Sequence, residues 1–157
     1  MPTPRLERIN ASLAAAAREA ASRPDPGGRP FAIGWATVEL DRAASEFASE
    51  LGLPAAAFAP APASEILGAT CRVADGALPD GLSLAILEPA TEGRIAATLA
   101  RLGEGPAVIW SPADNEIIAG TSAARPGPFG PERLVLGGPV HGPHRLLVGT
   151  EPGTIRA

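Results

Sequence analysis

The only two histidines of the chain, His141 and His144, stand close together in the segment His-Gly-Pro-His. Imidazole is the side chain best suited to general-base catalysis or metal binding near neutral pH. A two-histidine metal site needs further ligands, and this spacing is not that of a helical site. The glycine and proline between them predict a turn. We expect a solvated or hydrogen-bonded pair, with His144 as the candidate base if it begins a strand that faces a cavity, and His141 as the second candidate.

Four other residues have side chains that are able to do chemistry. Cys71 is the sole cysteine, so no disulfide forms within the chain, and a small buried hydrophobe is the expected role. Arg72 and Arg145 fall on predicted strands; either would bind a carboxylate or phosphate if it faced a cavity, and lies at a rim otherwise. Glu88 follows a predicted strand directly, where capping or a salt bridge is favoured over catalysis. The glycine-rich segments lack the spacing of a phosphate-binding loop.

Composition excludes several classes of protein. The 157 residues are 45% hydrophobic with a net charge of −4, which predicts a soluble globular domain. The acidic balance and the lack of basic clusters argue against a nucleic-acid partner. The chain contains no run of about 18 apolar residues, so no membrane span is predicted. A lone cysteine fits the cytoplasm.

Apolar periodicity and turn residues outline the elements. We predict an N-terminal helix over residues 4–22, a linker over 23–30 and one domain over 31–152. Within the domain, strands are predicted at 31–40, 66–74, 82–88, 107–111, 133–138 and 144–150, and helices at 42–51 and 92–102. Residues 53–65 are placed only as an irregular or edge segment, and 117–131 stay unassigned apart from a possible strand at 116–121. Thr3, Asp41 and Thr91 are the expected N-caps, and Gly52 and Gly103 the helix ends.

Three blocks of this pattern resemble a known family. "AIGWATVELDRAASEFASELG", "LAILEPATEGRIAATLARLGEGP" and "AVIWS" are similar, in order and spacing, to segments of the vicinal oxygen chelate superfamily, closest to its methylmalonyl-CoA epimerase-like members and more distantly to the glyoxalases. The resemblance implies an α+β fold with a mainly antiparallel curled sheet of paired βαβββ-type modules. The second module lacks its helix here, and the N-terminal helix is a candidate to cover the vacant face.

Enzymes of that superfamily hold a divalent metal with four side chains on facing strands, and the resemblance maps three of them onto Ala32, Ala85 and Val108. The fourth falls near His144, Arg145 or Leu146. Alanine and valine have no lone pair to offer a metal ion. We therefore expect neither a metal nor another cofactor.

Strand alternation places a set of small or apolar residues on one face of the sheet. These candidate ligand-binding residues are Ala32, Gly34, Ala36, Ala85, Leu87, Val108 and Trp110, with Arg145 added as a possible acid-binding group. They suit an apolar or acidic small ligand, although a filled core is an equal alternative. The first functional hypothesis is a metal-free glyoxalase-like binding protein, cytoplasmic and homodimeric. The second is a metal-independent lyase or isomerase acting on a carbonyl compound or acyl thioester with a histidine base. A purely structural or assembly module is a third.

Overall fold

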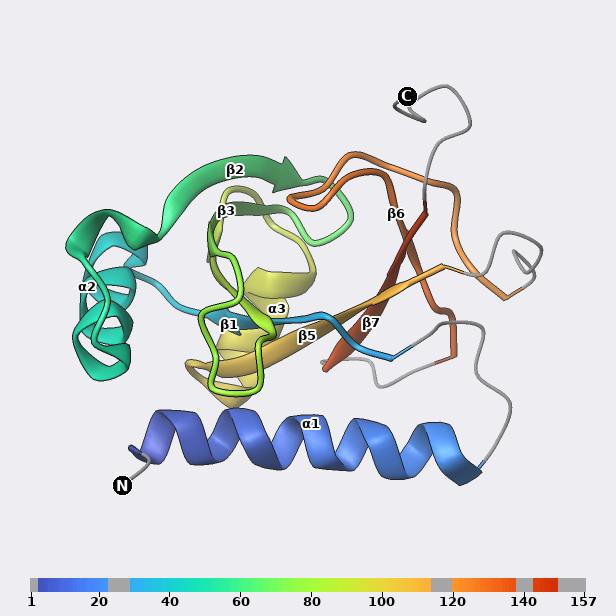
Figure 1. Ribbon diagram of the computed structural model, residues 1–157. Coiled ribbons are helices and arrows are strands. Elements are labelled where there is room, and N and C mark those ends of the chain that lie inside the picture. Colours follow the sequence, from blue (N-terminus) through green and yellow to red (C-terminus); the bar gives the residue numbers. More distant parts are fainter. Residues whose placement is uncertain (1–2, 23–28, 114–119, 138–142, 150–157) are drawn as a thin grey trace, which may run out of the picture.

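Seven strands form one mixed sheet, and three α-helices pack against it, in the part of the chain that the computed structural model describes, residues 3–22, 29–113, 120–137 and 143–149 (Figure 1). In chain order the elements are α1 (Pro4–Ser22), β1 (Ala32–Ala36), α2 (Leu40–Leu51), the 3-10 helix η1 (Ala55–Ala57), β2 (Ala59–Ser64), β3 (Ala69–Ala74), β4 (Ser83–Pro89), α3 (Arg94–Leu102), β5 (Gly105–Pro112), β6 (Glu132–Leu134) and β7 (His144–Val148). The predicted α+β class is confirmed.

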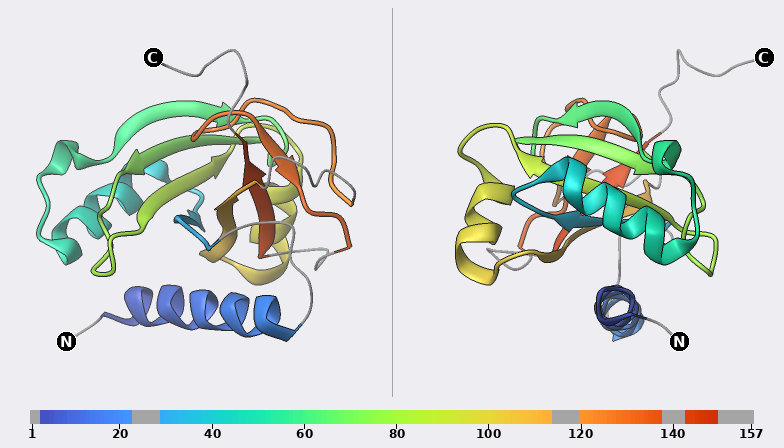
Figure 2. Two further views of the ribbon diagram at one scale, coloured as in Figure 1. Left: turned by 45° about the vertical axis from the view of Figure 1, so that its right-hand side comes forward. Right: turned by 90° about the vertical axis from the view of Figure 1, so that its left-hand side faces the viewer.

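The strand order is β2-β3-β4-β1-β5-β7-β6. The β1–β4 and β5–β7 pairs are parallel, and the other four pairs are antiparallel. The sheet is therefore mixed, with antiparallel pairs in the majority, where a mainly antiparallel sheet was predicted. It curls, as the two views of Figure 2 show, and its two end regions meet: Ser64, the last residue of β2, hydrogen-bonds Glu132, the first residue of β6. The concave side of this curled sheet is called the hollow below.

Helices α1 and α2 cover the face of the sheet that lies away from the hollow. Ile33 and Trp35 of β1 pack there against Phe47 of α2 and Ile9 of α1, because alternation along the strand sends odd-numbered β1 residues to this side. Below the sheet in Figure 1, α1 lies beside β5, with which it is in contact. No helix lies among the described residues between β5 and β6.

Side chains of α1 fasten it to the domain. Arg5 forms ion pairs with Glu46 and Glu50 of α2. The Arg8 guanidinium lies 5.2 Å from the centre of the Trp35 ring, a cation–π geometry. Thr3 caps the helix as predicted, since its hydroxyl accepts a hydrogen bond from the Leu6 N–H at 3.2 Å. No helix in the described part of the chain is both long and apolar enough to cross a bilayer.

Two predicted N-caps are wrong. Helix α2 begins at Leu40, and its first N–H donates to the Glu88 carboxylate at 2.7 Å. The role expected for Glu88 is thus confirmed, while Asp41 lies in the first turn and pairs with Arg72. Helix α3 begins at Arg94 after Gly93, beyond Thr91. Both predictions assumed a cap from a nearby polar residue. In α2 the acceptor comes from another strand instead, and α3 begins after Gly93 without a side-chain cap.

Several boundaries also differ from those predicted. Strand β3 begins at Ala69, since 65–68 form a turn, and the uncertain segment 53–65 contains η1 and the edge strand β2. The possible strand over 116–121 falls largely outside the described residues, although Thr121 forms a bridge with Val135. Gly52 and Gly103 end their helices as predicted, Gly52 in the left-handed conformation with φ of 69°.

Candidate functional site

The residues predicted to share one face do lie together, on the hollow side of β1, β4 and β5. The register places Gly34 of β1 beside Ala85 of β4 and Val108 of β5. One buried cluster contains the other six of the set, namely Ala32, Ala36, Ala85, Leu87, Val108 and Trp110. The alternation of side chains along the strands was therefore sufficient to predict which residues share this wall of the hollow.

Side chains fill the space beside this wall. All six residues of that cluster set are 0% exposed. A Cβ added to Gly34 would lie 2.5 Å from Val108 Cγ1, 2.8 Å from Leu87 Cδ1 and 3.0 Å from Trp110 Cη2, so the glycine is matched to a close approach of its neighbours. These contacts favour the alternative of a filled core at the wall itself.

The strand pairing locates the fourth metal-ligand position implied by the resemblance. Ala32 pairs with Trp110 and Gly34 with Val108, so the β1–β5 pairing is symmetric. In the parallel pairs, Gly34 lies beside Ala85 and Trp110 beside Leu146. Leu146 on β7 is therefore the counterpart of Ala85 on β4 in the strand register, and of the three residues near the fourth position it is the one that the resemblance implies.

A divalent metal does not fit these four positions. Ala32, Ala85, Val108 and Leu146 are 0% exposed and offer only methyl and methylene groups, whereas such an ion needs oxygen, nitrogen or sulfur donors. Within the described ranges, no group of three or more histidine, cysteine or acidic side chains is arranged to hold an ion.

The candidate base and the candidate arginine lie on opposite faces of β7. His144 pairs with Val108, so it faces the hollow, where it is buried and its Nε2 lies 3.3 Å from the Thr98 hydroxyl of α3. Arg145 pairs with Ile109, which faces away from the hollow, and its guanidinium lies 3.5 Å from the Ser111 hydroxyl. Arg145 is thus not brought together with the other candidates, and His141 lies outside the described residues.

A buried carboxyl that the sequence did not single out lies inside the hollow. Glu132 of β6 is 0% exposed. Its Oε2 accepts a hydrogen bond from the Ser64 hydroxyl at 2.6 Å and its Oε1 accepts one from Trp110 Nε1 at 3.0 Å. Burial raises the pKa of the Glu132 carboxyl, and the two hydrogen bonds oppose that rise. The strand was predicted to begin at Arg133; alternation with the apolar Leu134 was the available signal that Glu132 faces inward.

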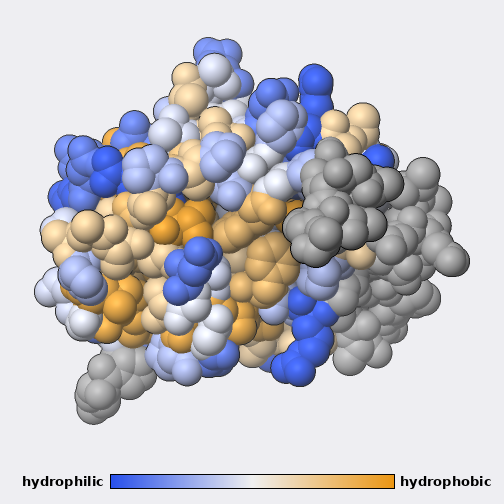
Figure 3. All heavy atoms as spheres, turned by 45° about the horizontal axis from the view of Figure 1, so that its top comes forward, coloured by the Kyte–Doolittle hydropathy of each residue, from blue (hydrophilic) through white to orange (hydrophobic). Residues whose placement is uncertain are grey.

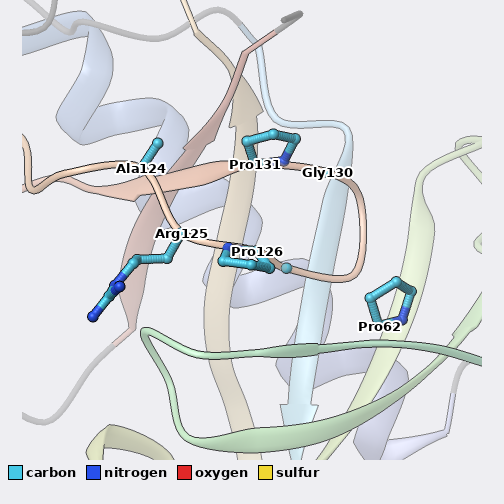
Figure 4. Close-up of a pocket in the computed structure, with 7 residues that line it drawn as sticks. Pro62, Ala124, Arg125, Pro126, Gly130 and Pro131 are labelled. Carbon is cyan, nitrogen blue, oxygen red and sulfur yellow. The ribbon is translucent and has the colours of Figure 1, made fainter. Parts of the chain in front are cut away.

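Near this carboxyl, a surface pocket of about 310 Å³ opens where the two end regions of the sheet meet. Its lining joins Pro62 of β2 to a turn that precedes β6 and contributes Ala124, Arg125, Pro126, Gly127, Gly130 and Pro131 (Figure 4). We call it the seam pocket. Apolar side chains gather in the middle of the face shown in Figure 3, with hydrophilic groups around them.

The seam pocket is adjacent to Glu132. The carboxylate oxygens of Glu132 lie close to the place where a Cβ on Gly127 would be, so the carboxylate contacts the backbone of a residue that lines the pocket. The seam is also held by the Glu65 N–H, which donates to the Pro126 carbonyl at 3.2 Å. The arrangement is an apolar opening beside an acidic group.

The curled sheet is similar in fold to solved structures of methylmalonyl-CoA epimerases. Methylmalonyl-CoA epimerase from Mycobacterium tuberculosis is similar with a TM-score of 0.63 and 16% identity, over 83% of this chain and 93% of that one. A Streptomyces coelicolor methylmalonyl-CoA epimerase variant in complex with 2-nitronate-propionyl-CoA gives 0.59 and 22%, over 79% and 98%. A hypothetical protein from Bacillus halodurans gives 0.55 and 15%, over 81% and 97%.

The sequence itself matches no family model and no curated protein. The likeness to solved structures confirms the resemblance to the methylmalonyl-CoA epimerases and the α+β class with a curled sheet. At such identities it carries the fold alone, so the chemistry is argued from this chain's own residues.

Proposed function

We propose that the protein binds a small, mainly apolar molecule in the hollow and does so without a divalent metal at the position where the resembled superfamily holds one. The observation that carries the proposal is the chemistry of Ala32, Ala85, Val108 and Leu146, which converge on the hollow and have no donor atom. An apolar wall of this kind favours an apolar ligand surface.

The seam pocket is the proposed entrance. The wall beside Gly34 is filled, so a ligand has to displace side chains to reach it, and the seam is the place where an opening already exists. The acidic ligand expected from the sequence depended on Arg145, which lies on the other face; its support is therefore weaker than that of an apolar ligand.

Metal analysis combined with a Co²⁺ titration tests the metal-free part of the proposal. We expect substoichiometric metal in the purified protein and no saturable cobalt absorption band. One equivalent of tightly bound metal that is lost in Glu132→Gln or in His144→Gln would contradict it, because these two inward side chains are the nearest remaining donors on β6 and β7. An Arg125→Gln variant at the rim of the seam pocket is the matched control.

A second candidate is a metal-independent isomerase or lyase with His144 as its base. The specific observation is that His144 faces the hollow beside Val108, in hydrogen-bond range of Thr98. The test is exchange of the α-proton of methylmalonyl-CoA in deuterated water. Exchange that His144→Gln abolishes would favour catalysis over binding; exchange unchanged in that variant would remove His144 from the role.

Three further expectations are part of the proposal. Two corresponding strand sets, β1 with β4 and β5 with β7, support two βαβββ-type modules, with α1 in place of the second module's helix. A homodimer and a cytoplasmic location are proposed from the sequence and its resemblance. Light scattering on the purified chain checks the dimer, and a single-chain mass would contradict it.

A further inference from the structure

We propose that Glu132 is the receptor for a protonated primary amine carried by an apolar ligand, which reaches it through the seam pocket. This deepens the proposed function by naming the ligand class, and it rests on that function for the entry of a small molecule into the hollow.

Among the described residues, the Glu132 carboxylate has no cationic partner. A carboxylate offers about four acceptor sites, and Ser64 and Trp110 each occupy one. None of the described arginines or histidines forms an ion pair with it. The titratable group that faces it from β3 is Cys71, whose thiol pKa is raised to about 12 by burial and in smaller part by the charge of Glu132. A buried charge is costly unless it is paired, so a ligand cation is the partner that the site lacks.

One aromatic ring contacts the carboxylate, and two further rings continue from it. Trp110, which donates its Nε1–H to Glu132, has its ring 4.9 Å from that of Phe129 at an angle of 70°. Phe129 in turn lies 5.3 Å from Phe31, nearly perpendicular to it. Ring faces attract ammonium groups, and the attraction grows when the cation is desolvated. An acid next to such rings favours an ammonium group with an aryl or alkyl body over a carboxylate, which Glu132 would repel.

The route from solvent to this group is short. Gly127 lines the seam pocket and its backbone contacts the carboxylate. The Gly130 N–H donates to the Gly127 carbonyl at 3.2 Å, and the Glu65 N–H donates to the Pro126 carbonyl at the same distance. Two backbone hydrogen bonds between Arg125 and Glu132, at 2.9 and 2.8 Å, close the base of the turn. If these two bonds stay in place, the tip of the turn opens by breaking the Glu65–Pro126 bond. The Arg125 side chain extends away from Pro62 (Figure 4) and lies 3.9 Å from a Glu65 oxygen; it does not occupy the opening.

Three probes of similar shape and different charge test the inference: benzylamine, benzyl alcohol and benzoate. Each is titrated into the full chain at pH 7.5, and binding is followed by amide chemical shifts. We expect benzylammonium to bind at least about tenfold more tightly than benzyl alcohol, and benzoate to bind more weakly than either. A tenfold difference corresponds to about 1.4 kcal/mol.

The matched variants are Glu132→Gln and Glu7→Gln, the second being the same change at an exposed residue of α1. Glu132→Gln keeps the shape of the side chain and is expected to abolish the preference for the amine while it retains the alcohol. Glu7→Gln is expected to leave the preference unchanged. If Glu132→Gln does not fold, Ser64→Ala replaces it: this change frees an acceptor site on Glu132, and the amine is expected to bind at least as tightly as in the wild type.

The negative outcomes distinguish failure of the amine inference from failure of the proposed function. Equal binding of amine and alcohol, or a preference for benzoate, overturns the amine inference and leaves the proposed small-molecule function standing. A preference for the amine that survives in Glu132→Gln also overturns the inference, as does loss of amine binding in Ser64→Ala. Absence of binding by all three probes counts against both proposals.

Discussion

Replacing Gly34 by alanine tests whether the hollow wall is filled. The added Cβ would meet Val108 Cγ1 at 2.5 Å, Leu87 Cδ1 at 2.8 Å and Trp110 Cη2 at 3.0 Å. These are the far ends of side chains, but all three residues are fully buried and cannot swing into solvent. Overpacking of this kind costs about 1–3 kcal/mol. Loss of glycine's freedom in the unfolded chain returns about 0.4–1 kcal/mol, so we expect Gly34→Ala to lower the free energy of unfolding by about 1–2 kcal/mol.

Urea denaturation followed by circular dichroism measures this change, and a thermal melt should move by about 3–6 °C for a chain of this length. Val108→Ala is the matched variant, because it removes the methyl group nearest to the new Cβ. The double variant should be less destabilised than the sum of the two single variants by about 1 kcal/mol, the coupling expected of side chains in contact. A neutral or stabilising Gly34→Ala, with additive behaviour in the double variant, would refute a filled wall and indicate an open cavity instead.

Three other predictions concern titration and capping. Burial raises the pKa of Glu132, so the folded chain holds this proton more tightly than the unfolded chain. The stability that the group contributes is present below about pH 4.3 and is lost as pH rises from there through the folded pKa. In urea titrations at successive pH values, the stability of the wild type relative to Glu132→Gln should fall over this window, and parallel curves for the two proteins would contradict the assignment. The Cys71 thiol, with its pKa raised to about 12, should resist Ellman's reagent in the native protein and react only in denaturant; rapid native reaction would mean that β3 opens. Glu88→Ala should destabilise the chain by about 1 kcal/mol through loss of the acceptor for the Leu40 N–H, whereas Glu88→Gln, which keeps an oxygen, should lose less; equal effects in the two variants would exclude the capping contact.

The parts of the fold that the sequence predicted well are those with a strong periodic pattern of apolar residues. Alternation on β1 separated Ala32 and Ala36 from Ile33 and Trp35, and the structure packs the two pairs in different clusters. Alternation depends only on backbone geometry, so it survives low sequence similarity.

Long-range contacts explain what the sequence did not predict. The N–H at the start of α2 is satisfied by Glu88, 48 residues away, which no local cap rule detects. Glu132 lies at the first residue of a three-residue strand, too short for a pattern to fix its direction. Its partner Ser64 is at the opposite end of the sheet order, so their meeting depends on how far the sheet curls.

The packing of α1 has a consequence for how firmly this helix is held. This helix contacts the domain through side chains, with Leu6 and Ile9 buried and Arg5 paired to α2, and it contributes no strand to the sheet. Attachment of α1 therefore depends on a few side-chain contacts, so a substitution such as Ile9→Ala is expected to loosen this helix while every strand pair of the sheet stays in place.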